Sequence, residues 1–91
     1  MSFTMSWALA AQHADQWTGD DFAEAAAVFR TRCIATMLAA GMKPEQRGTF
    51  YEEFIGPIGE RIANQGRTAI EAGREWDTAR GPILLALAPA A

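Results

Sequence analysis

Apolar residues recur at helical spacing through residues 22–40, and this pattern constrains the fold more than any other feature of the sequence. The recurring positions are three or four residues apart: Phe22, Ala26, Phe29, Cys33, Thr36 and Ala40. A second apolar strip lies beside them: Ala23, Ala27, Ile34 and Leu38. Such spacing is typical of a helix that packs lengthwise against other helices. With Asp20 or Thr18 as the N-cap and Gly41 as the stop, this segment is predicted to be a central helix.

The rest of the chain shows few β-branched residues and no sustained apolar–polar alternation, which argues against strands. We therefore expect residues 1–91 to form one all-α domain, a small bundle of three main helices. The other two main helices are predicted at about residues 4–17 and 57–80. A short helix or kinked segment is expected near residues 44–56, because Gly56-Pro57 interrupts the helical pattern.

Glycines alternate with larger residues along the third predicted helix. This glycine seam consists of Ile55, Gly59, Ile62, Gly66, Ala69, Gly73 and Trp76. Each glycine inside a helix costs about 0.8–1 kcal/mol relative to alanine, so close packing against another helix is expected to offset the three. The alternative is that Gly66 simply breaks the helix. The sequence leaves open whether Gly59, Gly66 and Gly73 lie in an internal core or at a homodimer contact.

No residue pattern in the sequence indicates a catalytic, metal or cofactor site. His13 and Cys33 are the single histidine and cysteine, and a base–nucleophile pair would need a helix contact that the sequence does not show. The acidic group Asp15, Asp20, Asp21 and Glu24 lacks the ligand spacing of a calcium loop and fits the start of a helix. We expect no enzyme, no metal and no cofactor.

Charge and hydropathy restrict the partners and the location. The net charge of −3 provides no basic stripe for phosphates, so direct nucleic-acid binding is not expected. The longest apolar stretch, residues 82–91, is about half a membrane span, and the start of the chain lacks the basic segment of a signal peptide. A cytoplasmic protein without membrane contact is therefore predicted.

The apolar C-terminal tail, residues 82–91, needs a place to be buried. Its four large aliphatic side chains are Ile83, Leu84, Leu85 and Leu87. Complete burial of each contributes about 1.5–3 kcal/mol, so the tail is expected to pack on its own bundle as a last helical turn or on a second molecule. A free tail would be the site that binds a partner. Trp17, beside the Thr18-Gly19 break, is the other candidate protein-binding residue.

These observations favour a non-enzymatic protein-binding module: a small accessory, adaptor or inhibitor that docks on a larger protein. One version is an inhibitor encoded by a phage or mobile element. The alternatives are a self-assembling structural component, for example of a viral particle, and a small non-catalytic subunit of an enzyme complex. A domain of 91 residues buries only about 60–65% of its unfolded surface, which makes self-association or a protein partner the expected interaction.

Overall fold

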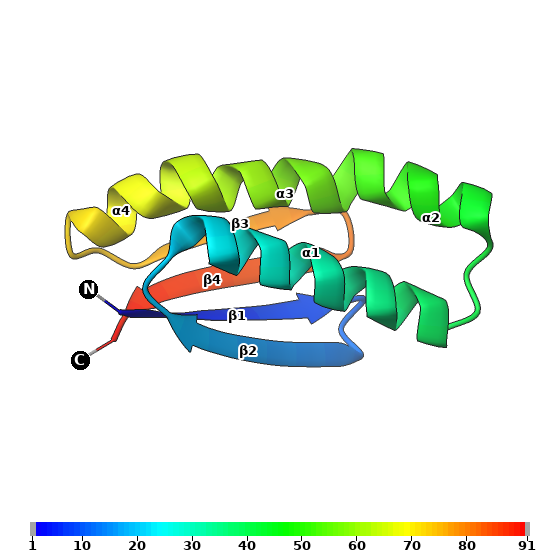
Figure 1. Ribbon diagram of the computed structural model, residues 1–91, viewed down its shortest axis with the longest axis horizontal. Helices are drawn as coiled ribbons and strands as arrows, with labels where there is room; N and C mark the ends of the chain where they lie inside the picture. Colours follow the sequence, from blue (N-terminus) through cyan, green and yellow to red (C-terminus); the bar gives the residue numbers. More distant parts are fainter. Residues whose placement is uncertain (1, 91) are drawn as a thin grey trace.

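The computed structural model describes residues 2–90 and shows a four-stranded antiparallel sheet with helices packed on one of its faces (Figure 1). The elements, in chain order, are β1 (Phe3–Leu9), β2 (His13–Gly19), α1 (Phe22–Ala39), α2 (Pro44–Phe50), η1 (Tyr51–Ile55), α3 (Gly56–Arg61), η2 (Ile62–Gly66), α4 (Arg67–Glu71), β3 (Trp76–Arg80) and β4 (Ile83–Pro89). The strand order is β2-β1-β4-β3, so the first and last strands of the chain pair at the centre of the sheet. Met1 and Ala91, which the predicted domain and tail included, lie outside the described residues.

The prediction of an all-α bundle of three main helices is wrong. Residues 4–17, predicted as a helix, belong to the β1–β2 hairpin, and the predicted helix over 57–80 ends at Glu71 and is followed by β3. The tail is neither a helical turn nor free, because residues 83–89 form the central strand β4. The segment predicted over residues 22–40 matches α1, and the short helix or kinked segment predicted near residues 44–56 corresponds to α2 and the π-helical turn η1.

The two central strands follow an alternation of large and small side chains. The large ones face the helices: Phe3, Met5, Trp7 and Leu9 of β1, and Ile83, Leu85 and Leu87 of β4. The residues between them are small in β1 and mostly alanine in β4. Alanine counts as apolar, so the period of two that marks a half-buried strand is hidden when only apolar and polar residues are distinguished.

The two hairpin turns differ in their sequence signals. Ala10 and Ala11, which follow β1, adopt left-handed backbone conformations with φ of 55° and 56°. Glycine, asparagine and aspartate are the usual residues at such positions, so nothing in Ala10-Ala11 predicts a turn. Gly81-Pro82, predicted as a helix stop, forms the β3–β4 turn, and the Pro82 carbonyl accepts a hydrogen bond from the Ala10 amide at 2.8 Å.

Helix α1 begins at an aspartate cap and ends at a glycine. The N-cap is Asp21, not Asp20 or Thr18, and its carboxylate accepts a 2.9 Å hydrogen bond from the Glu24 amide. At the other end Gly41 has a φ of 75°, and the Met42 amide donates to the Met37 carbonyl at 3.1 Å. This is the Schellman arrangement that glycine permits.

Residues 44–71 form one helical run with two π-helical turns, η1 and η2. The first turn precedes Pro57, which has no amide to donate to the Glu53 carbonyl one turn earlier. That carbonyl instead accepts a hydrogen bond from Nε of Arg80 in β3. Arg61 donates to the Thr78 hydroxyl at 2.9 Å, so two arginine contacts fix the helical run to the edge strand β3.

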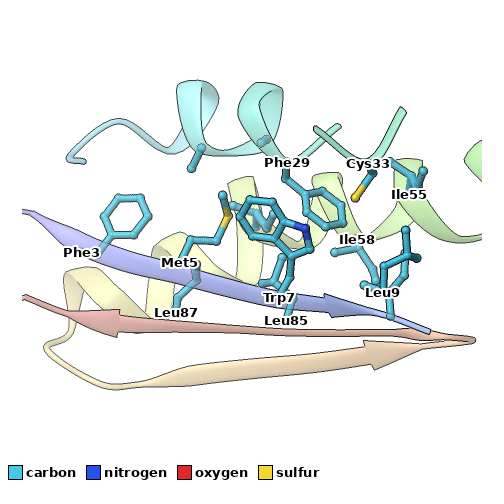
Figure 2. Close-up of a cluster of buried hydrophobic side chains, with 14 of the residues drawn as sticks. Phe3, Met5, Trp7, Leu9, Phe29, Cys33, Ile55, Ile58, Leu85 and Leu87 are labelled. Carbon is cyan, nitrogen blue, oxygen red and sulfur yellow. The ribbon is translucent and has the colours of Figure 1, made fainter. Parts of the chain in front are cut away.

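The core lies between the helices and the sheet (Figure 2). Phe29 of α1 meets the Trp7 ring edge-to-face at 5.6 Å between centroids, and Phe22 stacks on Phe3 at 4.4 Å. The seam of α1 therefore packs against the sheet, and α1 also contacts α3 and η2 of the helical run. A side chain that packs on a strand needs the same three- and four-residue spacing, so periodicity alone does not identify its partner.

The glycine seam is divided between three environments. A Cβ on Gly66 would lie 2.7 Å from Leu87 Cδ1 and 3.0 Å from Trp76 Cε3, so this glycine permits the helical run to approach the sheet closely. Gly59 lies against the Arg30 side chain, at 3.0 Å from the position of a Cβ. Gly73 is not in a helix and has a φ of 76°. The two helical glycines are thus in internal contacts.

Substitution of Gly66 tests the close approach of helix and sheet. Gly66→Leu is expected to lower the free energy of unfolding by about 1–3 kcal/mol, because Leu87 and Trp76 leave no volume for the new side chain. Gly48→Leu is the matched control, since a Cβ there has no heavy atom within 4 Å, and higher helix propensity should stabilise by about 0.5–1 kcal/mol. Urea denaturation measures both, and stabilisation by both variants would contradict the packing.

The cap of α1 is tested with two neighbouring aspartates. Asp21→Ala is expected to lower the free energy of unfolding by about 1 kcal/mol, since the Glu24 amide loses its acceptor. Asp20→Ala removes the same charge one residue earlier and should change stability by less than about 0.5 kcal/mol. Equal losses in thermal or urea denaturation would show that charge near the helix end, not the hydrogen bond, is responsible.

Candidate functional site

The face of the sheet opposite the helices carries no covering element within residues 2–90. Side chains alternate between the two faces of a strand, and strand pairing places eleven of them on this side. The open face, as we call it, consists of Thr4, Ser6, Ala8, Ala14, Gln16, Thr18, Asp77, Ala79, Leu84, Ala86 and Ala88. Its side chains are exposed or half-buried, in contrast to the core residues that alternate with them in the central strands.

The open face is arranged in three rows that cross the strands. One row is Thr18, Thr4 and Ala88; the next is Gln16, Ser6, Ala86 and Asp77; the last is Ala14, Ala8, Leu84 and Ala79. The last two rows line a shallow hollow of about 850 Å³. Leu84 is the one large aliphatic side chain of the eleven, with 62% of its surface exposed.

The open face is more apolar than the solvated face of an antiparallel sheet usually is. Six of its eleven residues are apolar, namely five alanines and Leu84, and Asp77 is the single charged one. Antiparallel sheets with one solvated face normally carry polar side chains at the outward positions. Small side chains also leave the strand backbones within reach of another surface.

The predicted protein-binding residues divide between the two sides of the sheet. Ile83, Leu85 and Leu87 are buried in the core, so they are not accessible to a partner. Trp17 is half-buried on the helical side of β2 and meets Phe3 edge-to-face at 5.7 Å. Leu84 alone lies on the open face. Alternate residues of the tail are thus buried in the core, and Leu84 stays exposed.

The remaining charged groups on β2 and α1 serve structural contacts. Arg32 of α1 donates to Asp15 at 3.2 Å and to the Gln16 carbonyl at 3.1 Å, and its guanidinium lies 6.0 Å from the Trp7 ring centroid. Asp21 caps α1. No three histidine, cysteine, aspartate or glutamate side chains within residues 2–90 gather as metal ligands would.

Cys33 is buried on the inner side of α1 and is 1% exposed, whereas His13 lies exposed at the start of β2. Burial, together with the nearby Asp15 carboxylate, raises the pKa of the Cys33 thiol to about 12. A neutral, inaccessible thiol is a poor nucleophile. This cysteine therefore acts as a small apolar core residue.

The exposed strip on α1 is a second apolar feature. Ile34 and Leu38, predicted to make this helix central, point away from the core and are 38% and 54% exposed. The helix packs on one side only, so the strip faces solvent. It is narrow, and α1 presents charged residues beside it.

Ten of the eleven open-face residues escaped the sequence analysis, which singled out only Leu84. The signal that identifies them is the set of small residues between large ones: Thr4, Ser6 and Ala8 in β1, and Ala86 and Ala88 in β4. Two segments with this alternation predict paired strands with one bulky and one small face. The open-face residues of β2 and β3 are then identified by their pairing with β1 and β4.

Because Cys33 is buried, the free energy of unfolding is expected to depend on pH in the alkaline range. The folded pKa lies above the unfolded value near 9, so the thiol contributes stability that is complete below pH 9 and is lost as the pH rises toward 12. The free energy of unfolding of the wild-type protein should therefore fall more steeply between pH 9 and 11 than that of Cys33→Ala. Parallel slopes in urea titrations at each pH would contradict this burial of the thiol.

Comparison of the chain with protein-family models, with curated proteins and with solved structures finds no match to any of them. None of the helices within residues 2–90 combines the length and the apolarity needed to cross a membrane. The function is therefore inferred from the open face.

Proposed function

We propose that the chain is a non-catalytic protein-binding module that docks through the open face of its sheet. The observation that carries this proposal is the composition of that face: six apolar residues, four uncharged polar residues and Asp77, with no helix over them. Contact surfaces in protein complexes are depleted of charge at their centre in the same way.

The geometry of the face supports docking by a protein surface rather than binding of a small molecule. Sites for small molecules are concave and enclose most of the ligand. The hollow over Ser6, Ala8 and Leu84 is wide and shallow. A flat, mostly apolar area bordered by Gln16 and Asp77 suits a broad partner.

The absence of catalysis remains part of the proposal and is supported by the placement of the reactive side chains. Cys33 is buried and its thiol has a raised pKa. His13 is exposed at the start of the edge strand β2 and is well separated from Cys33 in the sequence. Within residues 2–90 the open face offers Ser6, Thr4 and Thr18 as hydroxyl groups, with no histidine or lysine beside them. An adaptor, an inhibitor or a non-catalytic subunit needs no catalytic group.

A photo-crosslinking amino acid at position 84, introduced in the cell that makes the protein, tests this function. We expect covalent adducts with a protein partner from position 84, because Leu84 is the largest exposed apolar side chain of the proposed contact. The matched control places the same amino acid at position 38, which is similarly exposed but lies on α1. Absence of adducts at position 84, or equal adducts at both positions, would contradict docking through the open face.

A further inference from the structure

We propose that the occupant of the open face is a second copy of this chain, with the two sheets stacked face to face about a two-fold axis. The axis runs parallel to the strands and lies between β1 and β4. This inference rests on the proposed function, since it names the partner for the same surface. It follows from the way in which the three rows of the open face complement themselves.

A two-fold axis in this position exchanges β1 with β4 and β2 with β3 while keeping each row in place. In the last row, Leu84 of one copy then lies over Ala8 of the other, and Ala79 lies over Ala14. In the first row Ala88 lies over Thr4. The one large side chain of the face thus meets a small one, and the two copies of Leu84 flank the axis.

The charge of the face agrees with the same axis. Asp77 lies over Gln16 of the other copy, where an amide hydrogen can meet the carboxylate. A two-fold axis perpendicular to the strands and centred on this row would instead place the two Asp77 carboxylates against each other. Like charges in contact are unfavourable, so the parallel axis is favoured over this perpendicular one.

The shapes of the two surfaces permit such stacking. Packed sheets keep their strands within about 30° of each other, and strands related by this axis meet that condition. Sheets normally pack about 10 Å apart, and alanine and serine side chains allow a closer approach. With three strands of seven residues and β3 of five, each face covers about 410 Å², so the two copies together bury roughly 800 Å².

An area of this size predicts a weak, reversible dimer. Specific interfaces usually bury about 1,200–2,000 Å², and smaller ones belong to transient contacts. We therefore expect a dissociation constant on the order of micromolar, so that monomer and dimer exchange with concentration. The affinity should depend on Leu84, because it is the one large side chain that the contact buries and a few such residues dominate the binding energy of an interface.

Sedimentation equilibrium of the purified protein, from micromolar to near-millimolar concentration, tests the dimer. Wild-type protein is expected to shift from monomer to dimer, and Leu84→Arg should weaken dimerisation at least tenfold. Leu38→Arg carries the same charge on α1 and should leave dimerisation unchanged, with circular dichroism verifying that both variants fold. A wild-type monomer throughout, or equal weakening by both variants, would overturn the inference.

A second pair of variants tests the axis and does not depend on position 84. Gln16→Lys should tighten the dimer about 2–10-fold through an ion pair with Asp77, and Gln16→Asp should weaken it. Gln12→Lys, in the exposed β1–β2 turn, controls for the change in net charge and should have a smaller effect. The opposite order of affinities for the two Gln16 variants would overturn the arrangement.

Mixed cross-linking gives the register directly. Gln16→Cys and Asp77→Cys proteins are mixed and treated with a short bis-maleimide, and the expected product joins position 16 of one chain to position 77 of the other. Wild-type protein is the control for Cys33, which is buried. Predominant 77–77 products would overturn the parallel axis. A monomer here together with adducts to a different protein at position 84 would overturn the self-association while leaving the docking function intact.

Discussion

The pairing of β1 with β4 is the interaction on which the rest of the structure depends. These strands bring Phe3–Leu9 and Ile83–Pro89 into one antiparallel register at the centre of the sheet. Each carries one hairpin partner at its outer side, and together they form the surface against which α1 and the helical run 44–71 pack. Without this pair the two hairpins would be separate two-stranded ribbons, which are marginal in water.

Helix α1 could be predicted because its signals are local. The sheet could not be predicted in the same way, because its signals depend on side-chain size. Over residues 22–40 the apolar spacing, the acidic first turn and the terminal glycine all indicate α1. In β1 and β4 the alternation is between large and small residues, and alanine conceals it. Alanine also favours helix intrinsically, and tertiary packing overrides that preference here.

The candidate site shows the same division. The apolar tail was expected to bury all four of its large aliphatic side chains; three of them are buried, and Leu84 is 62% exposed. As a strand the tail sends Leu85 and Leu87 to the core and Leu84 to the other face. Apolarity alone does not assign those faces within residues 82–91, because both kinds of position are apolar. The assignment needs β1, whose Trp7 and Met5 mark the buried side.

The central pair also determines when this protein can fold. The nearest paired residues of β1 and β4, Leu9 and Ile83, are separated by most of the chain, so the pairing closes a very long loop. During synthesis at roughly 5–20 residues per second, the β1–β2 hairpin waits several seconds for its partner. Until β4 emerges, the edge of β1 that pairs with it has no strand partner, and an unpaired strand edge is a template for aggregation. The protein is therefore most prone to aggregate in the interval before β4 leaves the ribosome.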